Sequence, residues 1–303
     1  MITIENVSKT FGTVKALNNL SITITSGTVF GLVGSNGSGK STLLRILSGV
    51  YTADSGSITI DGENAYDNET VKGKCCFVSD FPYFSNNATL KNMAVLYRSL
   101  YPNWNEEKYQ TLSKIFPINN KDKIIRMSKG MQRQVALILA LSVCPKYLFL
   151  DEIFDGLDPV IRQLVKKLIV DDITENNMTV IIASHNLREL EDICDHIGFL
   201  HKGGILLEQE IDDLKLNLHR IQVAYENPLP ENAFAQLDIV KLKNTGKLYE
   251  LVARGTLEEI ETIVKSHNPL FCEVLPLTLE EIFISEMEVA GYDIDNILNQ
   301  QTQ

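Results

Sequence analysis

The stretch Gly34-Ser-Asn-Gly-Ser-Gly-Lys-Ser41 decides the fold of this chain. The residues before it, 28–33, form a continuous apolar run that is typical of a strand buried on both faces. The residues after it, 41–48, have the spacing of a short helix. A G-x-x-x-x-G-K-S pattern between a strand and a helix is typical of a loop that binds a nucleoside triphosphate. A chance match in a glycine-rich turn is the alternative, and it leaves the flanking strand and helix unexplained.

Phosphate chemistry accounts for the residue types in this loop. Glycines let the backbone pass close to phosphate oxygens, so that successive N–H groups and the N-terminus of the next helix face the anion. We expect Lys40 to contact the β- and γ-phosphates and the Ser41 hydroxyl to bind Mg²⁺. The residues predicted to bind the nucleotide here are Gly34, Ser35, Asn36, Gly37, Ser38, Gly39, Lys40, Ser41 and Thr42.

Two carboxylates follow a second apolar strand. Residues 147–150 read Tyr-Leu-Phe-Leu, and Asp151 and Glu152 come directly after them. Strand ends of this kind face the ligand crevice in open α/β sheets. We expect Asp151 to hold Mg²⁺, directly or through water, and Glu152 to polarise an attacking water. A pair of solvated acids is the alternative, and it would be favoured without the phosphate loop.

The composition limits the classes of partner and compartment. The chain has 303 residues and a net charge of −11, and an acidic total argues against binding to a nucleic-acid backbone. The number of cysteines is odd and no C-x-x-C spacing occurs, so we interpret them as buried reduced thiols of a cytosolic protein. They are Cys75, Cys76, Cys144, Cys194 and Cys272.

No segment of the sequence is expected to cross a membrane. The start has neither the basic nor the apolar region of a signal peptide. The longest apolar stretch, residues 135–150, is interrupted by Pro145 and Lys146 and is shorter than the ~20 residues that a spanning helix needs. A role at a membrane would therefore depend on a partner.

The pattern of strands and helices predicts an α/β fold with two domains. Alternating apolar residues in 2–24 predict antiparallel strands, and the apolar strands 147–150 and 179–183, joined by a helix at 160–175, predict a mostly parallel sheet. The main domain is expected to span residues 1–215, with a helical subdomain at about 85–145. Strands at 220–225, 248–252 and 271–275 and helices at 257–266 and 279–287 predict a small α+β accessory domain over residues 216–303.

Together with further motifs in the expected order, residues 1–215 resemble an ATP-binding cassette (ABC) domain, a P-loop NTPase fold with an antiparallel β subdomain and a helical subdomain. Met127-Ser-Lys-Gly-Met131 resembles the family signature LSGGQ at the start of a helix, with Ser128 as its N-cap. In the family this segment acts on the ATP of a second subunit, so the resemblance implies a head-to-tail dimer. Lys129 and Met131 differ from the signature, but Ser128 and Gly130 are kept, so activity is expected.

The resemblance also assigns roles to four single residues. Asp158 matches the acid in the loop that links the two active sites of the dimer. His185 matches the histidine that contacts the γ-phosphate and orients the catalytic carboxylate. Phe11 matches the aromatic residue that stacks on adenine, with a core aromatic residue as the alternative. Asp80, after the strand 75–78, replaces the usual glutamine that senses Mg²⁺ and the membrane subunit, and it is included in the predicted Mg²⁺ site.

The resemblance implies an ATPase that uses ATP and Mg²⁺, pairs with a second ABC subunit and powers a separate integral membrane permease from the cytoplasmic face of the cell membrane. ABC proteins of translation, cluster assembly or chromosomes are alternatives, but they usually have two cassettes, lack a long appendage or contain a long coiled coil. The segment Leu277-Thr-Leu-Glu-Glu-Ile-Phe283 resembles the tail of bacterial exporter ATPases for antibiotics or peptides. Export is therefore expected, and import is the alternative.

Residues 82–100 are expected to contact the permease. Their apolar side chains include Phe84, Leu90, Met93 and Tyr97. The alternative is that these side chains belong to the core of the helical subdomain.

Overall fold

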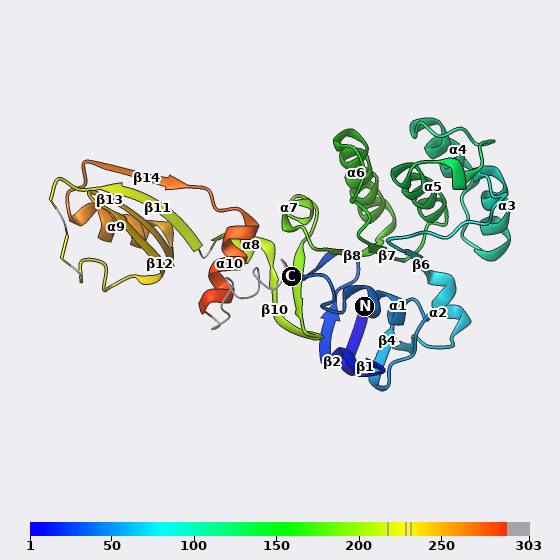
Figure 1. Ribbon diagram of the computed structural model, residues 1–303, viewed down its shortest axis with the longest axis horizontal. Helices are drawn as coiled ribbons and strands as arrows, with labels where there is room; N and C mark the ends of the chain where they lie inside the picture. The colour runs from blue at the N-terminus through cyan, green and yellow to red at the C-terminus, as the bar shows by residue number, and fades with distance from the viewer. Residues whose placement is uncertain (217, 228, 231, 290–303) are drawn as a thin grey trace. The chain divides into compact units, whose positions relative to one another are not determined.

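Strand β3 (Val29–Val33), which precedes the phosphate loop, lies inside a six-stranded sheet of order β10-β9-β3-β8-β7-β6. It pairs in parallel with β8 (Thr179–Ser184) and β9 (His196–His201), and all five of its residues are buried. In the computed structural model, which describes residues 1–303 except 217, 228, 231 and 290–303, this sheet is the core of the first of two compact units, Met1–Glu208 and Gln209–Gln303 (Figure 1).

The predicted parallel strands are confirmed. β7 (Tyr147–Asp151) pairs in parallel with β8 and with β6 (Cys75–Val78), and helix α6 (Pro159–Asn176) connects β7 to β8. Because parallel strands end at the same edge of a sheet, the segments that follow β3, β6, β7 and β8 meet there.

An antiparallel sheet of order β2-β1-β4-β5 covers the phosphate-loop helix α1 (Lys40–Leu47). It consists of β1 (Ile2–Phe11), β2 (Val14–Ile24), β4 (Ser55–Ile60) and β5 (Glu63–Asn64). Ile2 pairs with Ile24 and Ile4 with Ile22, as the alternating pattern predicts. These isoleucines form one apolar core with Leu43, Leu44 and Leu47 of α1.

Four helical segments follow the short helix α2 (Glu69–Lys74) and strand β6. They are α3 (Leu90–Leu100), α4 (Glu106–Ile115), the 3₁₀ turn η1 (Ile124–Arg126) and α5 (Lys129–Ser142). In Figure 1, α3 and α4 lie beside α5, which also packs against β6. Helix α7 (Leu187–Leu190) follows β8.

The described residues of the second unit form a four-stranded antiparallel sheet of order β12-β13-β11-β14 and three helices. The strands are β11 (Leu218–Ala224), β12 (Asp238–Thr245), β13 (Leu248–Arg254) and β14 (Phe271–Leu275), and the helices are α8 (Ile211–Leu216), α9 (Leu257–Ser266) and α10 (Leu279–Val289). The unit begins before the predicted residue 216 because α8 packs against β11 and α10. Strand β10 (Gly204–Glu210) runs across the division, and the predicted end of this domain, 290–303, lies outside the described residues.

Candidate functional site

The phosphate loop has a backbone that only glycine permits at two positions. Gly39 has a φ of +115°, and a Cβ on it would lie 2.5 Å from the carbonyl oxygen of Ala16. A Cβ on Gly34 would lie 2.3 Å from the carbonyl oxygen of Leu200. The loop is therefore held in a tight turn between β2 and β9, and α1 begins at its last lysine.

Lys40 is folded back into this loop. Its ammonium donates to the carbonyl oxygens of Gly34, at 2.6 Å, and Ser35, at 3.2 Å, and lies 3.5 Å from Oε1 of Glu152. Burial lowers the pKa of Lys40, and the charge of Glu152 opposes that shift. The loop thus presents one buried cation where a phosphate anion would lie.

Ser41 and Asp151 meet beside it. The Ser41 hydroxyl donates to Oδ1 of Asp151 at 3.0 Å, and Asp151 is fully buried. Burial raises the pKa of Asp151 to about 6, and its Oδ2 has no hydrogen-bond partner among the described residues. A hydroxyl oxygen next to a buried carboxylate oxygen that still lacks a partner is a donor set that suits Mg²⁺.

Glu152 joins the end of β7 to the end of β8. Its backbone has a φ of +47°, and its N–H donates to the carbonyl oxygen of Ala183 at 2.9 Å. Its Oε2 lies 2.9 Å from Nδ1 of His185, so the carboxylate spans from Lys40 to His185. Asp155 lies close by, since one ligand atom each of Glu152, Asp155 and His185 fall within 4.8 Å of one another.

Asp80 faces the same edge of the sheet. Its Oδ1 lies 3.5 Å from a guanidinium nitrogen of Arg45, and its charge contributes to the raised pKa of Asp151. The sequence analysis did not single out Arg45 or Asp155, because their relevance depends on contacts between distant segments. The Asp155 carboxylate could have been noticed from its position before the predicted Asp158 loop.

Ser128 and Gly130 stand at the start of α5, and Gly130 lies against the loop that leads to Asp158. The Ser128 hydroxyl caps α5 by accepting from the N–H of Met131 at 3.2 Å, as predicted. A Cβ on Gly130 would lie 2.5 Å from the carbonyl oxygen of Gly156. Asp158 caps α6 by accepting from two backbone N–H groups, at 3.1 and 3.0 Å. In the described part of the chain, the Ser128 hydroxyl bonds within α5 and the close neighbour of Gly130 is Gly156, not the phosphate loop.

Phe11 is 42% exposed and is held from two sides. The ring of Tyr51 meets it edge-on, with centroids 5.3 Å apart, and the ammonium of Lys9 lies 5.5 Å from its centroid. Asp54 accepts from Lys9 at 2.6 Å and from the N–H of Thr10 at 2.7 Å. The Phe11 ring is therefore exposed and held in place by its neighbours. It is not a core aromatic residue, which was the alternative interpretation.

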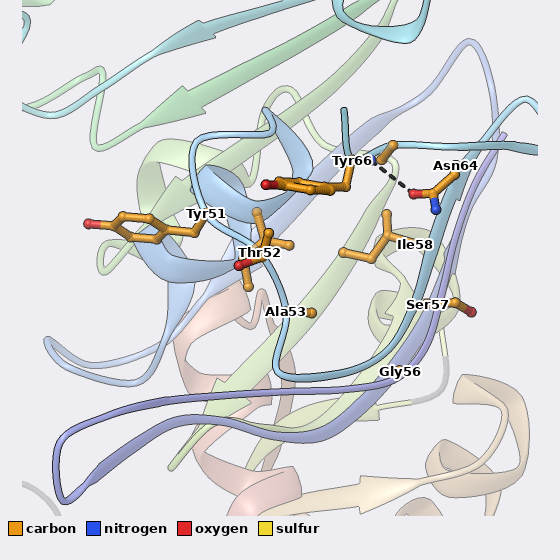
Figure 2. Close-up of a pocket in the computed structure, with 10 residues that line it drawn as sticks. Tyr51, Thr52, Ala53, Gly56, Ser57, Ile58, Asn64 and Tyr66 are labelled. Atoms are coloured by element: carbon orange, nitrogen blue, oxygen red, sulfur yellow. Dashed lines mark hydrogen bonds between the residues drawn. The ribbon is translucent and has the colours of Figure 1, made fainter. Parts of the chain in front are cut away.

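Tyr51 also lines a cavity of about 170 Å³ (Figure 2). Its walls include Thr52, Ser57 and Tyr66, and the N–H of Tyr66 donates to Oδ1 of Asn64 at 2.9 Å. None of the predicted site residues lines it.

The predicted permease segment is partly wrong in its residues. Phe84 and Leu90 are buried in the helical region, as the alternative interpretation had it. Tyr83 of this segment is instead 89% exposed, and Phe81, just before the segment, is 66% exposed. Within the residues that the structure describes, no helix is long and apolar enough to span a bilayer.

Known proteins resemble this chain in sequence over most of its length. Residues 17–155 match the family model described as "ABC transporter". The ABC transporter ATP-binding protein YtrB of Bacillus subtilis (strain 168) is 31% identical over 94% of this chain and 98% of its own length. The lantibiotic transport ATP-binding protein SrtF of Streptococcus pyogenes is 34% identical over 70% of this chain and 92% of its own length.

Other relatives of similar identity are importers of sulfate or methionine, so similarity alone does not distinguish export from import. A solved ATP-binding subunit of an ABC transporter superposes with a TM-score of 0.66 at 23% identity, covering 71% of this chain and 92% of that one. At that identity the match supports the fold alone.

Proposed function

This chain belongs to the ABC transporter family as an ATP-binding subunit, and we propose that it powers a bacterial permease that exports peptides or antibiotics. As a member of that family it binds and hydrolyses ATP to drive transport. The observation that supports the site assignment best is the continuous contact from Lys40 through Glu152 to His185, beside the pair of Ser41 and Asp151.

In the proposed mechanism, Glu152 polarises the attacking water. Its two oxygens are already engaged by Lys40 and by His185, so its orientation is set before the substrate arrives. On binding, the γ-phosphate takes over the Lys40 ammonium from the loop carbonyls of Gly34 and Ser35. His185, which is 45% exposed, then contacts the same phosphate and keeps Glu152 aligned.

Ser41 and Asp151 would hold Mg²⁺, and Asp80 would face it from the next loop. When bound, Mg²⁺ neutralises negative charge on the β- and γ-phosphate oxygens. The unpartnered Oδ2 of Asp151 supports this assignment, because a buried carboxylate oxygen without a partner is costly unless a ligand completes it.

The signature segment is proposed to complete the site of a second cassette. Gly130, two residues after Ser128, lies against Gly156 in the loop that leads to Asp158, and Phe11 would stack on the adenine of the nucleotide bound in its own chain. Homologous cassettes have been solved as dimers, which is compatible with this division of each site between two chains.

The permease is proposed to dock on the segment that follows Asp80. Exposed Phe81 and Tyr83 offer apolar surface there, next to a residue of the proposed Mg²⁺ site. The chain would then lie on the cytoplasmic face of the cell membrane. Export is favoured by the similarity to relatives named for lantibiotic and bacitracin transport and by the tail at residues 277–283.

The first test is to purify the tagged chain from detergent-solubilised membranes and to identify its partners by mass spectrometry. A multi-span membrane protein in stoichiometric amount is the expected result. Ribosomes, DNA or soluble partners alone would contradict a role in transport. Deletion of the gene for this chain should then make the cells more sensitive to peptide antibiotics. If the deletion instead makes the cells depend on a higher supply of an external nutrient, the result would indicate import.

A further inference from the structure

Arg133 is a buried cation that binds backbone instead of an acid. It lies on α5 and is 8% exposed. Its Nη1 donates to the carbonyl oxygen of Asp155, and its Nη2 donates to the carbonyl oxygen of Asp80 at 3.1 Å. Within the described part of the chain, no ion pair neutralises it, and its Nε has no hydrogen-bond partner. Burying a guanidinium without a counter-charge costs folding free energy, so we looked for a function that Arg133 serves at this position.

The two carbonyl groups belong to different loops at one edge of the sheet. Asp80 follows β6, and Asp155 follows β7. The space between them and α5 is filled, since a Cβ on Gly156 would lie 3.3 Å from Nη1 of Arg133 and a Cβ on Gly130 would lie 2.5 Å from the carbonyl oxygen of Gly156. A shift of either loop must therefore move the other or break a contact of Arg133.

Both loops also carry side chains of the proposed site. The carboxylate of Asp80 pairs with Arg45, and the carboxylate of Asp155 lies close to Glu152 and His185. We propose that Arg133 is a positioning residue that ties the Asp80 loop to the loop 155–158. Docking of the permease on the Asp80 loop would then place the loop 155–158 in the position that binds the partner cassette. This inference rests on the proposed function, which assigns the permease and the dimer to these loops.

The chemistry of arginine suits this task and that of lysine does not. The planar guanidinium directs several N–H donors at fixed angles, so it can hold two carbonyl groups that approach from different directions. A lysine ammonium keeps the charge and the aliphatic stem but is a single point donor. The unpartnered Nε leaves one donor for an acceptor that a second arrangement of the two loops would supply.

The experiment uses the full chain with Glu152→Gln, in which ATP hydrolysis is expected to be slow. Arg133→Met and Arg133→Lys are added separately, and Arg126→Met, an exposed arginine on η1, is the matched control. Binding of a fluorescent ATP analogue to the monomer and ATP-dependent dimerisation are measured for each. Arg133→Met is expected to bind the nucleotide like the parent but to dimerise about tenfold more weakly, and Arg133→Lys is expected to fall between the two.

The possible outcomes separate this inference from the function on which it depends. If the parent dimerises with ATP and Arg133→Met dimerises equally well, the inference is overturned. If Arg133→Met loses nucleotide binding together with dimerisation, its role is that of a general structural residue, which also overturns the inference. If the parent stays monomeric with ATP, the proposed function fails instead. Should Arg133→Met not fold, as thermal unfolding would reveal, Arg133→Lys decides by the same comparison.

Discussion

One carboxylate oxygen of Glu152 lies 2.9 Å from Nδ1 of His185, and the other lies 3.5 Å from the ammonium of Lys40. The carboxylate thereby connects the phosphate loop after β3 with the histidine after β8. Its left-handed backbone, with a φ of +47°, is unusual for a glutamate and turns the chain immediately after β7. Such strain is typical of residues whose position serves a site.

Glu152→Gln is expected to lower kcat by about 10²- to 10⁴-fold, because an amide keeps the shape of the side chain but does not accept a proton. ATP binding should persist, since Lys40 and the loop remain. Phosphate release and ATP-dependent dimerisation are the measurements. Glu175→Gln, the same chemical change at an exposed position of α6, is the control and should leave the rate unchanged. Rapid ATP hydrolysis by the Glu152→Gln variant would contradict the assignment of Glu152 as the general base.

Asp54→Ala is expected to raise KM for ATP by about three- to tenfold with little change in kcat, because it releases Lys9 and Thr10 from their positions at the Phe11 ring. Phe11→Ala should raise KM at least as much. Steady-state kinetics with ATP and GTP provide the measurement. Since stacking does not read the edge of the base, both nucleotides should be affected alike. A loss of kcat with KM unchanged would argue against an adenine site at Phe11.

Asp61→Asn is expected to lower the free energy of unfolding at pH 7 by about 1–3 kcal/mol. Burial alone would raise the pKa of Asp61, but hydrogen bonds from Lys146 and Tyr147 hold it well below its ordinary value. A depressed folded pKa stabilises the fold above the unfolded pKa, near 4, and that contribution is lost as the pH falls further.

The measurement is urea unfolding of both chains at pH 7 and at about pH 2.5, below the unfolded pKa of an aspartate, where the difference in the free energy of unfolding is expected to narrow. Asp67→Asn, at a carboxylate that is 87% exposed, is the control and should change little at either pH. A gap that stays constant with pH would show that the contribution of Asp61 does not come from its charge.

Cys75 and Cys76 are expected to react slowly with thiol reagents in the folded chain. Both are buried, and burial raises the pKa of each thiol to about 12, so little thiolate forms at pH 8. Cys144 and Cys272, which are only partly buried, should react first. Labelling followed by peptide mass spectrometry gives the order, and early labelling of Cys76 would contradict this expectation.

Local pattern was sufficient to predict most elements. The strands at 75–78 and 271–275 and the helix at 257–266 have the predicted bounds, because each has a clear apolar pattern bounded by turn residues. Strand β12 was missed, since most of its side chains are exposed and polar residues dominate it. Arg133, Arg45 and Asp155 were missed because their contacts join segments that are far apart in sequence. Phe84 and Leu90 show that apolar spacing on a helical segment marks burial more often than docking.

The placement of Ser128 away from its own phosphate loop has a kinetic consequence. If each working site needs Lys40 from one chain and Ser128 from another, hydrolysis by the isolated chain is second order in protein at low concentration, where most chains are monomeric, so specific activity rises with concentration there. A chain with a substituted signature segment would then inactivate the site formed with the phosphate loop of its native partner. The site formed by its own phosphate loop and the partner's signature segment would stay active. Mixing such chains with the native protein would lower the ATPase activity in proportion to the fraction of dimers that contain one chain of each kind. The same dominant-negative effect is expected in a cell that expresses both chains.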